Sequence, residues 1–310
     1  MNKEQLLAAL RERRNFKVEE YIQKKVAAIN KFFKDEFLDA AVVGLSGGVD
    51  SSVVYKLLLE AKKAPDSPIK RVVGVVAPVE AGTTGQNEAI NRAVELTNTS
   101  PDGSFANGDF IMVDGTRAAN SIIEQSPSTD SWAHGQLASI VRTPIFYYQV
   151  AILQTQGYRS ILTGTTNRSE GSYIGFFGKA SDAAVDLQPI ADIFKSEVLQ
   201  VAKALGVPES IISRPPTGDV YDGKTSEQLM GFSYDDLERF IMFYEGTCKD
   251  IFSKYFYEFE GESIFPSFKI IETWNTKNKH KYIGGQGFAR YIDVLPRAVN
   301  GGWREIKETH

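Results

Sequence analysis

The stretch that most constrains the fold is a run of small and β-branched apolar residues with a glycine-rich turn directly after it. Residues 40–45 read Ala-Ala-Val-Val-Gly-Leu, and residues 46–52 read Ser-Gly-Gly-Val-Asp-Ser-Ser. The first run predicts a strand buried on both faces. Apolar residues then repeat at helical spacing, as Val53 and Leu57 do, so the turn opens into a helix. A strand, a tight turn and a helix N-terminus together predict an anion site, because free N–H groups and the helix dipole favour negative charge.

The turn itself has the residues that a phosphate site needs. Gly47 and Gly48 let the backbone approach an anion closely, because neither residue carries a Cβ atom. Hydroxyl donors come from Ser46, Ser51 and Ser52. The turn lacks the Gly-Lys-Ser/Thr of a Walker A loop and the third glycine of the dinucleotide fingerprint. The alternative interpretation is an ordinary turn in which Asp50 caps the helix.

The composition predicts a globular protein. Of the 310 residues, 42% are hydrophobic and 24% are charged, and the apolar runs are too short for a membrane span. A single cysteine, Cys248, excludes an internal disulfide framework and fits a reducing compartment. The net charge of −4 argues against non-specific nucleic-acid binding. We therefore expect a cytoplasmic protein with neither a nucleic acid nor a membrane as its partner.

Strands and helices alternate along the first two thirds of the chain. Further strands are predicted at 71–77, 109–113 and 158–163, and helices at 17–38, 86–96, 116–125 and 135–156. Pro144 should kink or divide the last of these helices. The alternation predicts an α/β fold with a doubly wound, mostly parallel sheet flanked by helices. Later helices are predicted at 193–205, 234–244 and 264–277, so the C-terminal part is helical.

Two blocks of residues together resemble a known family. The turn at 46–52 resembles the PP-loop of the ATP pyrophosphatases, which split ATP between its α- and β-phosphates. A second block comprises Gly164–Glu170, Gly175–Lys179, Pro189–Lys195, Arg214–Thr217 and Ser226–Tyr234. This order and spacing resemble NAD synthetase, the PP-loop family that amidates deamido-NAD (nicotinic acid adenine dinucleotide). The resemblance runs from about Ala41 to about Lys281 and implies a fold like that of the adenine nucleotide alpha hydrolases.

The resemblance implies a domain plan. We expect one NAD synthetase-like α/β domain over residues 1–283, with a PP-loop core at about 17–206 and a helical part at about 207–283. Residues 284–310 would form a C-terminal tail. The 40 residues up to the start of the first strand are too few for a glutaminase domain of roughly 250 residues. The implied nitrogen donor is therefore ammonia, and the implied assembly is a homodimer.

The implied reaction is the ATP-dependent amidation of deamido-NAD by ammonia through an adenylated intermediate. The products are NAD, AMP and pyrophosphate, so the enzyme is a ligase that forms a C–N bond and needs Mg²⁺, with ATP as co-substrate. One alternative is another PP-loop ligase that acts on a nucleotide or on a tRNA base. A tRNA enzyme should have a basic domain or further cysteines, and neither is present. The other alternative is a non-catalytic nucleotide-binding relative.

The resemblance also implies site residues. Catalytic roles fall on Asp50, Glu170 and Lys195, and the two carboxylates would bind Mg²⁺, which prefers oxygen ligands. The implied ATP-binding residues are Ser46, Gly47, Gly48, Val49, Asp50, Ser51, Ser52, Thr165, Lys195 and Thr217. The implied deamido-NAD-binding residues are Arg142, Phe176, Lys179, Asp186, Glu227, His280 and Lys281.

Several of these residues also have an ordinary interpretation. Glu170 can be a solvated surface acid, and Lys195 can lie along the surface of a helix. Lys179 and Asp186 can form an exposed pair of little energetic weight. His280 can belong to a solvated basic run.

The helix before the fourth strand departs from the family pattern. Ser139 stands where the family usually has an arginine, and Arg142 follows three residues later. Because residues three apart share one face of a helix, we expect Arg142 to supply the missing substrate contact.

Overall fold

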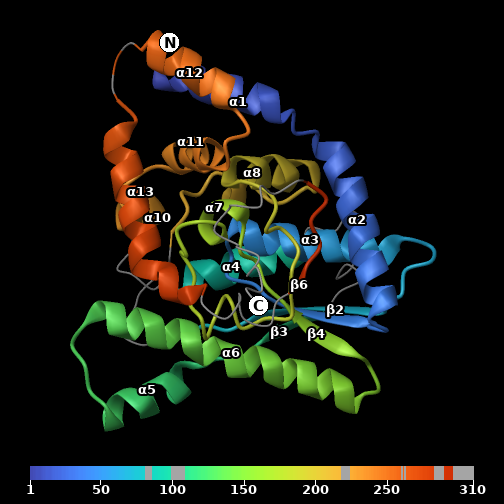
Figure 1. Ribbon diagram of the computed structural model, residues 1–310. Helices are drawn as coiled ribbons and strands as arrows, with labels where there is room; N and C mark the ends of the chain where they lie inside the picture. The colour runs from blue at the N-terminus through green and yellow to red at the C-terminus, as the bar shows by residue number, and fades with distance from the viewer. Residues whose placement is uncertain are drawn as a thin grey trace, which may run out of the picture.

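The computed structural model describes residues 1–80, 86–98, 109–217, 224–259, 261, 263–282 and 290–295. Within these residues the chain builds a parallel sheet of six strands in the order β3-β2-β1-β4-β5-β6 (Figure 1). In chain order the strands are β1 Ala40–Gly44, β2 Arg71–Val76, β3 Asp109–Met112, β4 Ser160–Thr163, β5 Leu187–Gln188 and β6 Arg290–Tyr291. All five pairs of neighbouring strands in this sheet are parallel. The predicted fold class is confirmed.

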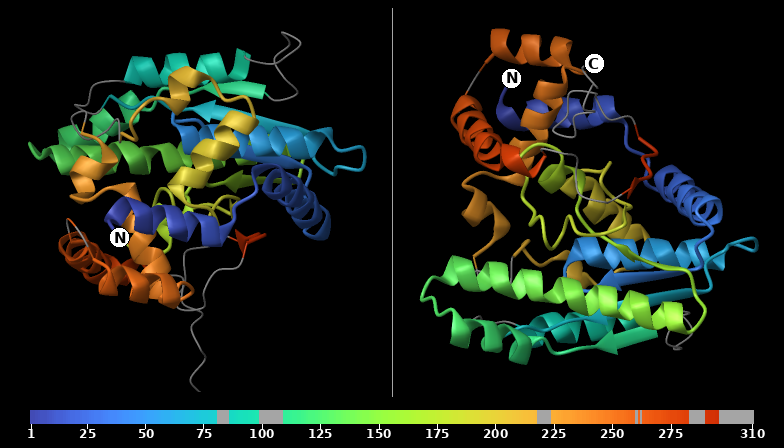
Figure 2. Two further views of the ribbon diagram at one scale, coloured as in Figure 1. Left: turned by 90° about the horizontal axis from the view of Figure 1, so that it is seen from above. Right: turned by 60° about the horizontal axis from the view of Figure 1, so that its bottom comes forward.

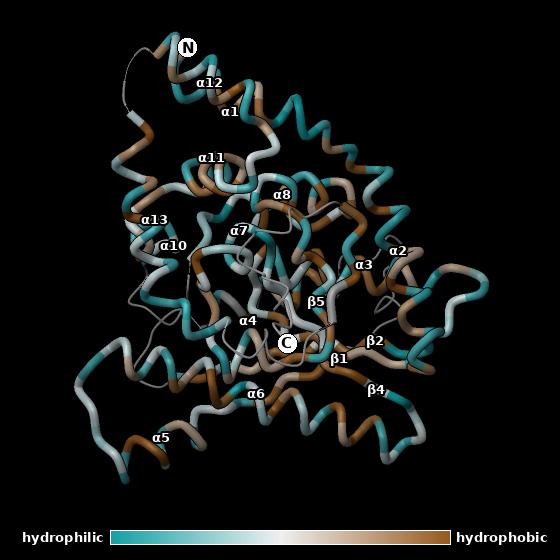
Figure 3. Tube along the Cα trace, in the orientation of Figure 1, coloured by the Kyte–Doolittle hydropathy of each residue, from teal (hydrophilic) through white to brown (hydrophobic). Residues whose placement is uncertain are grey.

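Strand β1 lies at the centre of the sheet. Ala41 pairs with Val72 of β2 on one side and with Ile161 of β4 on the other. The side chains of residues 40–43 are fully buried, which explains why both faces of this strand are apolar. Figure 3 shows the hydrophobic colour concentrated on the strands, whereas the outer helices α1 (Lys3–Arg14) and α2 (Val18–Asp35) carry long hydrophilic stretches.

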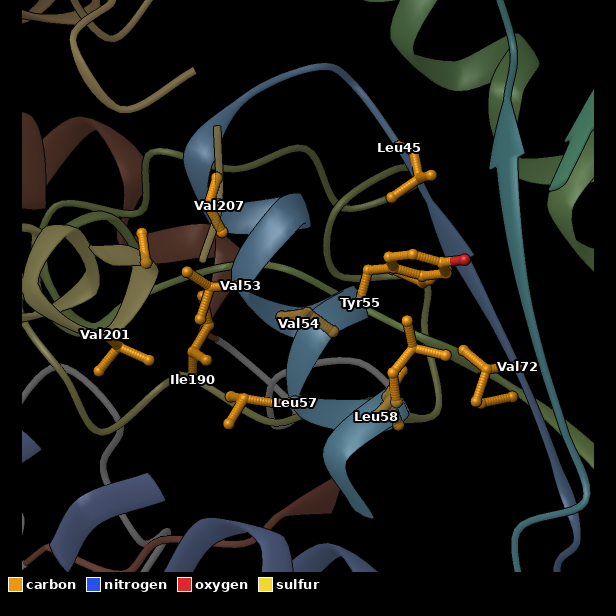
Figure 4. Close-up of a cluster of buried hydrophobic side chains, with 14 of the residues drawn as sticks. Leu45, Val53, Val54, Tyr55, Leu57, Leu58, Val72, Ile190, Val201 and Val207 are labelled. Carbon is orange, nitrogen blue, oxygen red and sulfur yellow. The ribbon is translucent and has the colours of Figure 1, made fainter. Parts of the chain in front are cut away.

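Helices cover both faces of the sheet. Helix α6 (Ser131–Thr155) contacts β1 and β4 from below in Figure 1, and α3 (Val49–Lys63) lies against β1 and β2 from above. Helices α2 (Val18–Asp35) and α8 (Lys195–Ala204) pack on α3 and on each other. In Figure 4, α3 directs Val53 and Leu57 toward Val201 of α8, and Leu58 toward Val72 of β2. This packing between helix and sheet fixes the position of α3, and therefore also the position of the turn at its N-terminus.

We predicted that Pro144 would kink or divide this helix, and since α6 continues through it as one helix, the division is wrong. A proline removes one intrahelical hydrogen bond, but the helix is packed on both sides of that position: Val141 lies in a buried cluster with Val79, and Val150 in another with Val42 of β1. The other helices of the α/β core are α4 Gln86–Asn98, α5 Thr116–Gln125, α7 Arg168–Gly171 and α9 Glu209–Ile212. Of the described helices, none combines the length and the apolar character needed to cross a membrane.

A second, helical cluster brings the N-terminal helix together with the helices of residues 226–281. It contains α1 Lys3–Arg14, α10 Ser226–Met230, α11 Tyr234–Glu245, α12 Lys249–Tyr257, α13 Phe265–Asn278 and the 3₁₀ helix Lys279–Lys281. Helix α1 packs on α11 and α12, and it lies against these C-terminal helices in both views of Figure 2. Leu6 and Leu10 of α1 are completely buried in this cluster. The helical C-terminal part was predicted, but the contribution of α1 to it was not.

Part of the predicted C-terminal tail completes the sheet. Strand β6 pairs with β5, and residues 292–295 pack against the main core. The Nζ of Lys25 donates to the carbonyl of Ile292 over 2.7 Å, and the backbone N–H of Val294 donates to Asp192 Oδ2 over 2.9 Å. Lys25 and Asp192 form an ion pair of 3.0 Å with both side chains fully buried. This pair ties the segment to the turn that precedes α8.

Candidate active site

A cavity of about 860 Å³ opens at the carboxyl ends of β1, β2 and β4. Its walls include residues 44–51 after β1, 76–78 at the end of β2 and 162–166 at the end of β4. This is the edge at which ligands of doubly wound sheets bind. Because the carboxyl ends of parallel strands meet at one edge, the sequence also predicts that residues 78–85 and Asp114, which follow two other strands, converge here. Asp114 does not line the cavity, and residues 81–85 lie outside the described part of the chain.

The glycine-rich turn forms a compact cradle at the N-terminus of α3. Gly47 has a φ of 71°, a left-handed conformation that favours glycine, and Gly48 is the N-cap of the helix. The hydroxyl groups of Ser51 and Ser52 donate to the carbonyl of Gly48 over 3.0 and 2.8 Å. The Oγ atoms of Ser46 and Ser51 are 3.2 Å apart. These bonds hold the turn in a shape that exposes backbone N–H groups to the cavity.

A buried charge cluster faces this cradle. The Nζ of Lys195 donates to Asp50 Oδ2 and lies 3.3 Å from Glu170 Oε1. Asn167 Nδ2 donates to Asp50 Oδ1 over 2.8 Å, and the hydroxyl of Tyr234 donates to Glu170 Oε1 over 2.6 Å. Asp50 comes from α3, Glu170 from α7 and Lys195 from α8, so three separate elements bring the predicted catalytic residues together.

Burial and charge shift the titration of this cluster. Burial raises the pKa of Glu170 above its ordinary value, against the opposing effect of Lys195. Burial also raises the pKa of Tyr234 well above its ordinary value, and the neighbouring Glu170 adds to that shift. For Lys195, burial lowers the pKa, but the combined attraction of Asp50 and Glu170 outweighs it and the pKa is raised. The lysine therefore stays protonated between two carboxyl groups, and the phenol remains a hydrogen-bond donor.

The same cluster offers oxygen ligands for a hard cation. Asp50 and Glu170 both reach the Nζ of one lysine, so the two carboxyl groups face the same small volume. Among the described residues, no group of three or more His, Cys, Asp or Glu side chains could hold a metal ion. A cation here would take at most two protein carboxylates and complete its shell with water and phosphate oxygens, which is the way Mg²⁺ usually binds beside nucleotides.

Three of the residues predicted for deamido-NAD also line this cavity. These are Arg142, Phe176 and Lys281. The Nε of Arg142 donates to the carbonyl of Ala77 over 2.9 Å. The Nζ of Lys281 donates to the carbonyl of Gly175 over 2.8 Å. Both cations are thus held at the cavity wall by backbone oxygens.

The other four residues predicted for this substrate do not line the cavity. They are Lys179, Asp186, Glu227 and His280. The Oδ2 of Asp186 accepts from the N–H of Leu162 over 2.8 Å, and Glu227 Oε1 accepts from the N–H of Tyr234 over 2.8 Å. These two carboxylates therefore brace the backbone of segments that flank the site. All the predicted ATP-binding residues except Ser52 line the cavity, Thr165 and Thr217 included.

Three supporting residues were not predicted from the sequence. Asn167 and Tyr234 hold the two carboxylates, as described above. Gln188 of β5 accepts from the N–H of Thr166 over 3.1 Å, and a Cβ on Gly164 would lie 2.5 Å from its amide. Asn167 and Tyr234 lie within the second sequence block, and Gln188 directly precedes one of its segments. This proximity was the only sequence signal that could have identified them.

Comparison with known proteins decides the family. The NAD synthase family model matches residues 21–282, which include the cradle, the charge cluster, Arg142, Phe176 and Lys281. The chain belongs to the NAD synthase family. The NH(3)-dependent NAD(+) synthetase of Methanococcoides burtonii is 31% identical over 207 residues, covering 66% of this chain and 71% of the relative. The enzyme of the same name from Thermoplasma volcanium is 30% identical over 260 residues, covering 84% and 94%.

Solved structures of similar fold agree with this family. NMN synthetase from Francisella tularensis superposes with a TM-score of 0.68 at 23% identity, covering 86% of this chain and 96% of that one. NH3-dependent NAD synthetase from Campylobacter jejuni superposes with a TM-score of 0.62 at 21% identity, with the same coverage. In this NAD synthase family member, Ser139 and Arg142 both line the cavity from α6, as their spacing predicts.

Proposed function

We propose that this chain is an ammonia-dependent NAD synthetase. It uses ATP and ammonia to amidate deamido-NAD and releases NAD, AMP and pyrophosphate. The observation that carries this proposal is the joining, in one cavity, of an anion cradle and the Asp50–Lys195–Glu170 cluster. A chain that only bound a nucleotide would need the cradle but not two carboxylates held against a buried lysine.

In the first chemical step, a carboxylate oxygen of deamido-NAD attacks the α-phosphorus of ATP. The bond from that phosphorus to the bridging oxygen breaks, and pyrophosphate leaves with the electron pair. The backbone N–H groups around Gly47 and Gly48 receive the negative charge that develops on the leaving group. Lys195 lies at the cavity wall with Asp50, where its ammonium group can donate to phosphate oxygens.

In the second step, the nitrogen of ammonia attacks the carbonyl carbon of the mixed anhydride. AMP leaves with one former carboxylate oxygen, and the nitrogen loses a proton. Arg142 and Lys281 add positive charge to the cavity lining, which suits a substrate with a pyrophosphate bridge and a carboxylate. Phe176 lines the same cavity and offers an aromatic ring to the nicotinate ring.

The proposed metal is Mg²⁺ held by Asp50 and Glu170. When bound, it neutralises charge on the phosphate oxygens. Tyr234 and Asn167 orient the two carboxylates, so the oxygens that face the cation are held in place before it arrives.

We also propose a homodimer. Large apolar side chains are exposed on the neighbouring helices α5 and α6, namely Ile122, Ile140 and Tyr148. Exposed apolar side chains on adjoining helices support an interface between protein chains. The expected compartment is the cytoplasm, where a single buried thiol at Cys248 stays reduced.

The test incubates the purified chain with ATP, Mg²⁺, ammonium and deamido-NAD and separates the nucleotides by chromatography. Equal amounts of NAD and AMP are expected, and stoichiometric ADP would overturn the proposal. Nicotinic acid mononucleotide is offered in a parallel reaction, since one similar structure is named NMN synthetase. Turnover of the mononucleotide alone would change the substrate but not the chemistry. Glutamine in place of ammonium serves as the control for the nitrogen donor.

A further inference from the structure

Helix α4 places a buried arginine directly behind the glycine-rich cradle. Arg92 is 8% exposed, and its Nε donates to the carbonyl oxygen of Gly47 over 3.0 Å. Its neighbours Ala93 and Leu96 are buried in the main core, so the helix that carries the arginine is fixed relative to α3. Arg92 does not line the cavity, and no sequence motif identified it.

The bond from Arg92 sets the direction of one peptide group. In a planar trans peptide the carbonyl and the next N–H point in opposite directions. The carbonyl of Gly47 points at Arg92, so the N–H of Gly48 points the other way, toward the Oγ of Ser46, which is 3.3 Å away and lines the cavity. Two successive glycines resist rotation of this peptide only weakly. Without an anchor, the peptide can turn its carbonyl oxygen toward the anion that the cradle binds.

Arg92 also brings a permanent positive charge close to the cradle. A guanidinium group keeps its proton even when buried. Its side chain is 10% exposed, and one of its nitrogens lies 3.5 Å from the carboxylate of Glu88, which is 75% exposed. The guanidinium group is therefore held behind the cradle, where its Nε can anchor the turn.

We propose that Arg92 is a positioning residue for the pyrophosphate part of ATP. It keeps the carbonyl oxygen of Gly47 turned away from the anion, with the N–H of Gly48 on the side of Ser46 at the cavity wall. The identity of the anion rests on the proposed function, but the geometry of the anchor does not.

The test measures equilibrium binding of magnesium pyrophosphate to the full chain by isothermal titration calorimetry. Arg92→Met should weaken binding by at least about tenfold, since a hydrogen bond from a charged donor is typically worth that factor. Arg92→Lys, which keeps the charge, should fall between Arg92→Met and the wild type. Arg13→Met is the matched control, because Arg13 pairs with Asp250 in the distant helical cluster. It should bind like the wild type.

A purely structural role for Arg92 would reduce the fraction of binding-competent protein but not the affinity of the remainder. In steady state we therefore expect Arg92→Met to raise the KM for ATP and to leave the KM for deamido-NAD within about twofold. If folded Arg92→Met binds pyrophosphate as tightly as the wild type, the inference is wrong. If that variant does not fold, Arg92→Ala with added methylguanidinium decides: restored binding supports the anchor, and no restoration overturns it. If the wild type itself binds no pyrophosphate, the proposed function fails together with the inference.

Discussion

Replacing Lys195 by methionine should destabilise the protein strongly at neutral and alkaline pH. The Nζ lies 3.3 Å from Glu170, and the side chains of Lys195, Asp50 and Glu170 are only 6%, 18% and 16% exposed. At an effective dielectric constant of about 20, one such pair is worth about 5 kcal/mol. The cost of burying the lysine offsets part of this, so we expect a loss of about 3 kcal/mol in the free energy of unfolding at about pH 8.

The loss in the free energy of unfolding caused by Lys195→Met should be smaller at acid pH. Burial already raises the pKa of Glu170 above its ordinary value of 4.5, and removal of Lys195, which lowers that pKa, raises it further. A carboxyl group whose pKa is higher in the folded state binds its proton there while the unfolded chain has lost it. Stability therefore rises as the pH falls through the window between the two pKa values, by up to about 1.4 kcal/mol per pH unit.

Guanidinium chloride denaturation at about pH 5.5 and about pH 8 measures both effects. Lys203→Met is the matched control, because Lys203 lies exposed on the same helix and its loss should change the stability little at either pH. An equal loss for Lys195→Met at both pH values would refute the reasoning, since it would mean that the protonation of Glu170 does not depend on the lysine.

Three further predictions concern activity and stability. Asp50→Asn and Glu170→Gln should each lower turnover at least about 100-fold and destabilise the protein less than Lys195→Met does, because the buried lysine keeps one carboxylate partner; full activity at limiting Mg²⁺ would place the metal elsewhere. Lys25→Met should lower the free energy of unfolding by about 3–5 kcal/mol by leaving Asp192 buried and unpaired, and Lys25→Met/Asp192→Leu should recover part of it; no recovery in denaturant titrations would contradict the pairing. Gly164→Ala should raise the KM for ATP, since its Cβ would meet a side-chain amide of β5 at 2.5 Å, and an unchanged KM would show that the loop adapts.

The centre of the fold could be predicted because local and global signals agree there. A continuous apolar run predicted the buried strand β1, and the glycines after it predicted the turn into α3. Strands β5 and β6 could not be predicted, because each has two residues and exists only through its pairing with a neighbour. Helix α1 was missed for a similar reason: its leucines are buried by α11 and α12, which lie more than two hundred residues away in the sequence.

The candidate site shows the same division. Asp50, Glu170 and Lys195 came from motif order, and the structure brings all three to one cluster. Arg92 and Tyr234 could not be assigned, because what each does depends on which backbone or side-chain oxygen the fold places beside it. A sequence pattern identifies residues that contact a ligand more readily than it identifies residues that position those contacts.

The most direct measurement follows an oxygen atom. Deamido-NAD labelled with ¹⁸O in its carboxylate is incubated with the chain, ATP, Mg²⁺ and ammonium, and the products are examined by mass spectrometry. If the carboxylate attacks the α-phosphorus, each AMP formed carries one ¹⁸O atom and the pyrophosphate carries none. Label in inorganic phosphate together with ADP, or AMP without label, would contradict activation of the substrate by adenylation at this site.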